Sequence, residues 1–239
     1  MRVLSFSEKG CIRKNNEDSF LVLSQQGFYA VADGMGGHRA GEVASSTALQ
    51  ELEKLVPQLL EFEGQALENG LTEAFMHANR VVNDASTNKP ENAGMGTTMT
   101  VLLVRSNTAV IAHVGDSRAY LWRDEALTSL TVDHSLVGEL VRLGQITPEE
   151  AEKHPQRHVL MRAIGADQEI KVDCRSINIQ TGDVFLLCTD GFSNLISDQE
   201  LAEEFQEPSS WEGRFENLRK LTLERGAPDN FTALCCILE

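Results

Sequence analysis

Seven short runs of β-branched and aliphatic residues, each bounded by turn signals, restrict most strongly how this chain can fold. They read as strands at 19–24, 28–32, 97–105, 108–114, 119–123, 184–188 and 231–238. Most neighbouring runs are joined by short loops, and short loops connect antiparallel strands. The sequence therefore predicts antiparallel sheets.

Helical periodicity separates these strands into groups. Two long amphipathic stretches, 42–55 and 65–84, lie between the early and middle strands, and a further pair follows late in the chain. The first of the late pair begins with Ser197 and Glu200 in the spacing of a capping box, and the second covers 211–225. Helices and antiparallel strands in separate runs are typical of the α+β class.

Length and composition favour one large domain spanning 1–239. At 239 residues the chain can bury roughly 70–75% of its unfolded surface. Apolar residues make up 41% and charged residues 24%, and no repeat or Pro/Gly/Ser-rich linker divides the sequence.

Charge and hydropathy limit the kinds of molecule that this chain could bind. No apolar stretch is long enough to span a membrane and the N-terminus lacks a signal-peptide core, so we expect a soluble, cytoplasmic monomer without membrane contact. A net charge of −15 opposes binding to nucleic acid. The five cysteines show no metal-ligand spacing, which favours buried free thiols.

Four aspartates at strand ends suggest chemistry. Asp33 and Asp190 each follow an apolar strand and precede a glycine, which allows backbone or ligand to approach closely. Each pair alone is an ordinary turn signal, but Asp116 and Asp229 also lie at strand ends. Carboxylates that converge repel one another unless cations neutralise them, and oxygen ligands select Mg²⁺ or Mn²⁺. Metal-assisted hydrolysis is therefore a plausible activity.

Ordered motifs along the chain resemble a known family. Arg13-Lys14-Asn15-Asn16-Glu17-Asp18 comes first, followed by DGMGGH at 33–38, GDSR at 115–118, DHS at 133–135, TDG at 189–191 and DNFT at 229–232. Together they resemble the PPM, or type 2C, protein serine/threonine phosphatases. The compact length is most similar to bacterial members that oppose Hanks-type kinases.

The resemblance implies a fold and a metal site. The fold is a four-layer αββα sandwich of two antiparallel sheets flanked by helices. Two Mn²⁺ or Mg²⁺ ions and possibly a third are implied, with Asp33 bridging, the Gly34 carbonyl on one core ion, and Asp190 and Asp229 on the other. Asp116 and Asp190 match the ligands of the third ion, and Asp18 matches an acidic position that acts through water.

Substrate handling is also implied. Arg13 matches the residue that binds the substrate phosphate, and His38 is the candidate general acid for the leaving oxygen. The family's acid histidine directly follows Asp-Gly, where this chain has Met35. The remaining histidines are left outside the catalytic set: His77, His113, His134, His154 and His158. The broken, polar segment 133–162 corresponds to the family's substrate-selecting flap. The implied partners are phosphoprotein substrates and a Ser/Thr kinase with its targets.

Two other functions stay open at this level. The same carboxylates could serve a different Mg/Mn-dependent phosphohydrolase, although the acidic composition disfavours a nuclease. A pseudophosphatase that only binds partners is the second alternative, but every matched metal position is still an aspartate.

Overall fold

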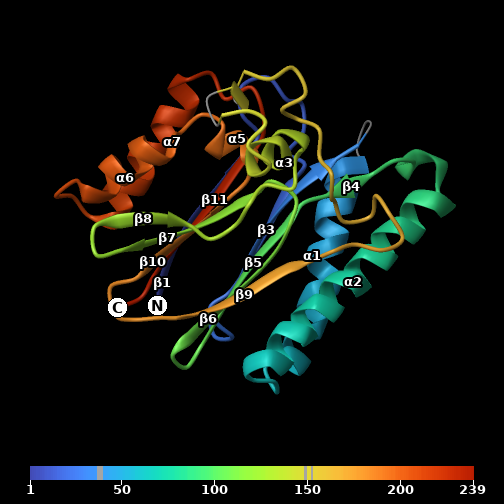
Figure 1. Cartoon of the computed structure of the whole chain (residues 1–239), viewed down its shortest axis with the longest axis horizontal. Coiled ribbons are helices and arrows are strands. Elements are labelled where there is room, and N and C mark those ends of the chain that lie inside the picture. Colours follow the sequence, from blue (N-terminus) through green and yellow to red (C-terminus); the bar gives the residue numbers. More distant parts are fainter. Residues whose placement is uncertain (37–39, 148–149, 152) are drawn as a thin grey trace.

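Two antiparallel sheets lie face to face at the centre of the molecule, and helices cover the outer side of each (Figure 1). The structure is a computed structural model that describes residues 1–36, 40–147, 150–151 and 153–239. The order of the layers is helices, sheet, sheet, helices. The predicted α+β class and αββα sandwich are confirmed.

Sheet A carries both ends of the chain. Its strand order is β1-β11-β10-β7-β8. The strands are β1 (Arg2–Glu8), β11 (Phe231–Ile237), β10 (Val184–Cys188), β7 (Arg118–Arg123) and β8 (Ala126–Ser129).

Sheet B contains the early and middle strands. Its order is β2-β3-β5-β6-β9, and the short β4 also pairs with β3. The strands are β2 (Asp18–Leu23), β3 (Phe28–Met35), β4 (Gly96–Thr97), β5 (Met99–Arg105), β6 (Thr108–Val114) and β9 (Asp173–Asn178).

Long helices cover the two sheets. Packed on sheet B are α1 (Ala40–Leu59) and α2 (Gly64–Asn88), and over sheet A lie α6 (Asp198–Gln206) and α7 (Trp211–Glu224). Shorter helices are η1 (Pro90–Asn92), α3 (Leu136–Arg142) and α5 (Asp190–Ser193). The capping box predicted at Ser197 and Glu200 is present at the start of α6.

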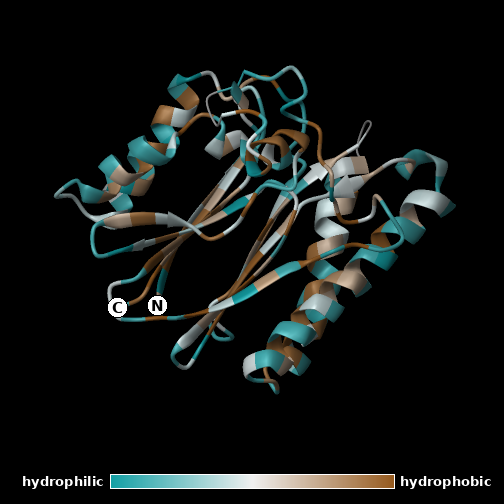
Figure 2. Ribbon diagram, in the orientation of Figure 1, coloured by the Kyte–Doolittle hydropathy of each residue, from teal (hydrophilic) through white to brown (hydrophobic). Residues whose placement is uncertain are grey.

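Alternating side chains explain the three-layered core. In β3, Phe28 and Ala30 pack against the helices α1 and α2, while Tyr29 and Val31 pack between the sheets. Successive side chains of a strand point to opposite faces, so a strand buried on both faces is apolar throughout. Figure 2 shows the resulting hydrophobic stretches along the central strands. Full burial of each large apolar side chain contributes roughly 1.5–3 kcal/mol to folding.

Three strands that the apolar pattern did not predict are edge or near-edge strands. They are β1, β8 and β9, whose residues are mostly exposed or half-buried. An edge strand needs no continuous apolar run, so its sequence carries a weak signal. The strand at 28–32 is also longer than predicted, since Asp33 and Gly34 lie inside β3.

The segment 133–162 runs from β8 back toward the core as turns and the helix α3. Ser135 caps α3 by accepting a hydrogen bond from the Gly138 nitrogen at 3.1 Å. Thr147 and Glu150 form a reciprocal cap, in which the Thr147 nitrogen donates to Glu150 Oε2 at 2.8 Å and the Glu150 nitrogen donates to the Thr147 hydroxyl at 3.2 Å. Pro148 and Glu149, which lie between them in the sequence, are outside the described residues.

The cysteines are free thiols, as predicted. Cys188, Cys235 and Cys236 are buried, whereas Cys174 is half-buried and Cys11 is exposed, so the prediction of burial is wrong for Cys11. In the described part of the chain, none of the helices combines the length and the apolar character needed to span a membrane.

Candidate metal centre

The strand ends that carry the predicted aspartates meet at one edge of the sandwich. In sheet A, β10 is antiparallel to both neighbours, β11 and β7, so its end lies beside their starts. Asp190 follows the end of β10, Asp229 precedes β11 and Asp116 precedes β7. In sheet B, Asp18 and Asp33 are directly opposite each other on β2 and β3. We call this edge, with its five aspartates, the active edge.

Asp33 has carboxylates from both sheets around it. Burial is the largest cause that raises its pKa well above the usual value, and the charges of Asp18, Asp190 and Asp116 raise it further. Its carboxyl also lies within hydrogen-bonding reach of Asp190. The backbone at Asp33 is fixed by Thr98, whose hydroxyl accepts from the Asp33 nitrogen at 2.9 Å. The side chain is thus held in place among like charges.

Only one of the two carboxylate oxygens of Asp18 is hydrogen-bonded within the described part of the chain. Its Oδ2 accepts hydrogen bonds from the hydroxyls of Thr189 at 2.9 Å and Thr232 at 2.7 Å. Its Oδ1 is buried and has no partner among the described residues. Burial raises the pKa of Asp18 to about 7, although the two threonine bonds lower it. A buried oxygen without a donor costs free energy, and a cation or an ordered water would remove that cost.

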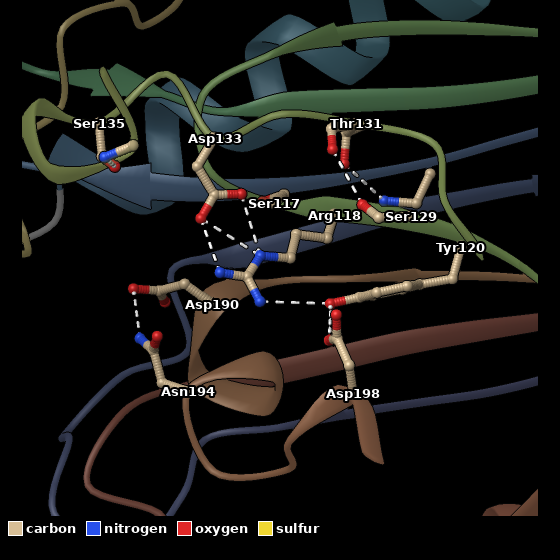
Figure 3. Close-up of polar contacts among 12 residues, drawn as sticks. Ser117, Arg118, Tyr120, Ser129, Thr131, Asp133, Ser135, Asp190, Asn194 and Asp198 are labelled. Atoms are coloured by element: carbon tan, nitrogen blue, oxygen red, sulfur yellow. Dashed lines mark hydrogen bonds and ion pairs between the residues drawn. The ribbon is translucent and has the colours of Figure 1, made fainter. Parts of the chain in front are cut away.

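Asp116 and Asp190 complete the cluster on the sheet A side. Burial is the largest cause that raises the pKa of each, followed for Asp116 by the charge of Asp190. The Asp190 Oδ2 accepts a 3.1 Å bond from the Asn194 Nδ2 (Figure 3). Repulsion among these groups is what bound cations would relieve.

The donor set of the active edge fits hard divalent cations. It offers carboxylate oxygens, the hard ligands that Mg²⁺ and Mn²⁺ prefer. Among the described residues no three side chains already form a closed set around one ion. Mg²⁺ and similar ions bind through one or two carboxylates and keep several waters, so paired carboxylates suffice for each ion.

Two glycines allow the close packing around the cluster. A Cβ on Gly34 would lie 2.0 Å from the Gly41 carbonyl oxygen of α1, and one on Gly191 would lie 1.9 Å from the Asn230 carbonyl oxygen. Any larger residue would push these segments apart. Both Asp-Gly pairs therefore serve close backbone approach, as the sequence suggested.

Arg13 lies at the rim of the active edge. Its Nη2 donates to the Asp229 Oδ2 at 2.7 Å, and half of the Arg13 side chain is exposed. The second Asp229 oxygen accepts from the Asn230 nitrogen at 2.8 Å. Arg13 is thus next to the carboxylates, where it can also reach an incoming anion.

Asn230 and the threonines around Asp18 are organising residues to which the sequence analysis assigned no role. The buried Asn230 accepts from the Glu17 nitrogen and donates to the carbonyls of Lys9 and Asn15, at 2.8 to 2.9 Å. These bonds tie the loop that carries Arg13 to the start of β11. The advance signal was that Asn230 and Thr232 belong to the DNFT motif and Thr189 belongs to the TDG motif.

Arg118 joins the active edge to the segment 133–162 (Figure 3). Its guanidinium binds both oxygens of Asp133, with Nε–Oδ1 at 3.0 Å and Nη2–Oδ2 at 2.7 Å. Its Nη1 lies 3.3 Å from the Tyr120 hydroxyl, which donates to Asp198 Oδ1 at 2.9 Å.

The histidines differ in their surroundings. His113 is buried in β6 with Nδ1 at 2.9 Å from the Thr100 hydroxyl, and burial lowers its pKa to about 3. His134 packs against it, with ring centroids 4.7 Å apart. His38 lies outside the described residues, so its proposed role stays a prediction.

Comparison with known proteins agrees with this geometry. A family model described as protein phosphatase 2C matches residues 2–145. Serine/threonine protein phosphatase PstP of Mycobacterium tuberculosis is 40% identical and matches 98% of this chain, but the match spans only 44% of that protein's length. Serine/threonine phosphatase stp of Listeria monocytogenes is 37% identical over 95% of this chain and 92% of its own.

A solved structure extends the likeness to three dimensions. The catalytic domain of PstP in complex with two manganese ions matches with a TM-score of 0.86 and 38% identity, over 98% of this chain and 96% of that one. The chain belongs to the protein phosphatase 2C family of metal-dependent serine/threonine phosphatases. The predicted family is confirmed.

Proposed function

We propose that this protein hydrolyses phosphoserine and phosphothreonine monoesters in proteins, using two core Mn²⁺ or Mg²⁺ ions and a third ion beside them. The observation that carries the proposal is the meeting of five aspartates from both sheets at the active edge, with the buried Oδ1 of Asp18 left without a donor. The manganese ions in the related PstP catalytic domain support the choice of metal.

The residues take the roles that the family match suggested. Asp33 would bind both core ions, the Gly34 carbonyl would bind one of them, and Asp190 and Asp229 would bind the other. Asp116 and Asp190 would hold a third ion. Asp18, which is opposite Asp33 in the pairing of β2 and β3, would orient a water through its unbonded Oδ1. When bound, the ions supply Lewis acidity that lowers the pKa of a water and offsets charge on phosphoryl oxygens.

Two side chains act on the substrate. Arg13 exchanges its contact with Asp229 for a bidentate contact with the substrate phosphate. This contact holds the phosphorus atom in position for in-line attack. His38 donates a proton to the leaving serine or threonine oxygen. If so, replacing His38 by Ala should steepen the dependence of turnover on leaving-group pKa, whereas equal dependence would remove His38 from this role.

Phosphoproteins are the proposed substrates, and a Ser/Thr kinase of the Hanks type is the proposed opposing enzyme. The names of the bacterial relatives support this assignment. We further propose a cytoplasmic monomer with one phosphatase domain over 1–239, whose flap is the segment 133–162.

Cleavage of a phosphothreonine peptide by the purified protein tests the proposal. We expect release of phosphate that requires Mn²⁺ or Mg²⁺, stops with a chelator and is lost in Asp33→Asn. A folded protein that cleaves none of these peptides with any divalent metal would be a pseudophosphatase. Preferential cleavage of nucleic acid or a small phosphate ester would instead indicate the other hydrolase class.

A further inference from the structure

The side chain of Asn230 joins three segments of the molecule. It is buried, with 4% of the residue exposed. Its Nδ2 donates to the carbonyls of Lys9 at 2.8 Å and Asn15 at 2.9 Å, and its Oδ1 accepts from the Glu17 nitrogen at 2.8 Å. Both ends of the loop that contains Arg13 are therefore bonded to one nitrogen atom.

We call residues 9–15 the arginine loop, and its second half is held by this contact. The first half has a bond of its own, because the Cys11 nitrogen donates at 2.8 Å to a carbonyl of the segment before β11. For residues 12–15, within the described part of the chain, the bond that Asn15 accepts from Asn230 is the only backbone hydrogen bond to another segment. One carboxamide therefore sets the position of the half of the loop that includes the arginine.

The three bonds require the side chain of an asparagine. It offers two N–H donors and one carbonyl acceptor on a short side chain. Aspartate has no donor, serine has one, and glutamine is longer by one methylene. The bonded groups also fix which way the amide points, because a turned-over amide would place its oxygen against a carbonyl.

We propose that Asn230 is a positioning residue that holds Arg13 in the orientation that binds the substrate phosphate. This role rests on the proposed function, in which Arg13 makes that contact. A half-exposed arginine on a loosely held loop samples many orientations, and its apparent affinity falls with the fraction of molecules that are competent to bind. Since the bound complex is the same in either case, the loss should be found in KM and not in kcat.

The groups of the active edge beside Asn230 are held by other bonds. The Asp229 carboxylate accepts from the backbone nitrogen of Asn230, which stays when the side chain is changed. The Glu17 carbonyl accepts from the Ser45 hydroxyl at 2.6 Å and from the Gly34 nitrogen at 3.1 Å. Removal of the Asn230 carboxamide should therefore leave the affinity for Mn²⁺ nearly unchanged.

A second buried asparagine supplies a matched control. Asn79 of α2 is 1% exposed, and its Nδ2 donates to the carbonyls of Asp167 at 2.9 Å and Gln168 at 3.2 Å. Its Oδ1 accepts from the Gly165 nitrogen at 2.7 Å. Asn79→Ala therefore removes the same three kinds of bond from a segment that does not carry Arg13.

The experiment is a double-mutant cycle measured on a phosphothreonine peptide with saturating Mn²⁺. Asn230→Ala should raise KM about 3–10-fold, the effect of about one lost hydrogen bond, and should change kcat by less than about 2-fold. In the Arg13→Ala background the same substitution should change KM no further, because the group that it positions is already gone. Amide exchange of residues 12–15 should be faster in Asn230→Ala and equal to wild type in Asn79→Ala.

Four results would overturn this role. They are a KM equal to wild type in Asn230→Ala, an equal rise in Asn79→Ala, a loss of kcat or of Mn²⁺ affinity in place of the rise in KM, and an undiminished effect in the Arg13→Ala background. If Asn230→Ala does not fold, Asn230→Ser, whose hydroxyl can keep one bond, decides by the same criteria. A folded wild type that does not cleave the peptide with any divalent metal would instead reject the proposed function itself.

Discussion

The two ends of β10 hold aspartates in different ways. At its start, Asp183 is completely buried, and its carboxylate is bonded by Arg123 and by the Gln180 nitrogen at 2.9 Å. At its end, Asp190 lies among other carboxylates, and burial and the charge of Asp229 raise its pKa. The nearby arginine, Arg118, is bound to Asp133. The aspartate at the start of β10 is paired with an arginine, whereas among the described residues no arginine is bonded to the aspartate at its end.

This difference separates structural from functional carboxylates. A buried charge is tolerated when a hydrogen-bonded partner accompanies it, as Arg123 accompanies Asp183. At the active edge the chain keeps several carboxylates together without enough cations of its own. Such an arrangement lowers the stability of the empty protein and favours binding of external cations.

Replacing one aspartate at each end of β10 should give opposite results. We expect Asp190→Asn to lower phosphopeptide turnover by at least about 100-fold, since even groups that only orient a ligand change metal affinity by that order. Its melting temperature in chelator should stay equal or rise, because repulsion is relieved. Turnover and thermal unfolding measured on the same preparations check both effects.

The matched variant is Asp183→Asn. It should leave turnover within about 2-fold but lower the free energy of unfolding by about 2 kcal/mol, the size expected for lost charged hydrogen bonds. For a chain of this length that corresponds to a fall in melting temperature of about 4–8 °C. Comparable losses of turnover in both variants would contradict the division between the two ends.

A smaller effect is expected at the rim, where Arg13 partly offsets Asp229. Arg13→Ala should raise KM for a phosphopeptide about 10-fold, as loss of charge-assisted bonds of about 1.5–3 kcal/mol predicts. Affinity for Mn²⁺ should stay nearly unchanged. Arg13→Lys keeps the charge but cannot bind the phosphate bidentately, so its KM should lie between those of the wild type and Arg13→Ala. An unaltered KM in Arg13→Ala would take this residue out of the phosphate site.

A separate effect concerns the pH dependence of the stability of the metal-free protein. The pKa of Asp18 is about 7 in the folded state and lies near 4 in the unfolded chain. The folded state therefore holds the proton more tightly, and the stability this provides is full below about pH 4 and is lost as pH rises through 7. Asp18→Asn should flatten this decline in chelator. Urea unfolding between pH 4 and 8 measures it, and a decline equal to wild type would contradict the assignment.

Prediction from sequence succeeded where a local pattern had one physical cause. Continuous runs of β-branched and aliphatic residues located the central strands, and three- and four-residue steps located α1 and α2, although α1 extends to Leu59 and α2 to Asn88. The strand-end aspartates were recognised because a strand fixes where its last side chain points. Edge strands such as β9 were missed, since a strand exposed on one side leaves only a faint pattern.

The sequence by itself determined the antiparallel α+β fold and the family, and it predicted hard oxygen ligands at the strand ends. Only the tertiary structure decided which carboxylates are hydrogen-bonded and which are not, because the groups that bond them lie far away in the sequence. Thr232 reaches Asp18 across 214 positions, and Asn230 reaches the Lys9 carbonyl across 221. The register of β1 on β11, the register of β2 on β3 and the packing of the two sheets set these meetings, and register follows from the packing of whole faces. The same packing places Arg123 in contact with Asp183 and Arg118 in contact with Asp133. Neither arginine is therefore bonded to an aspartate of the active edge.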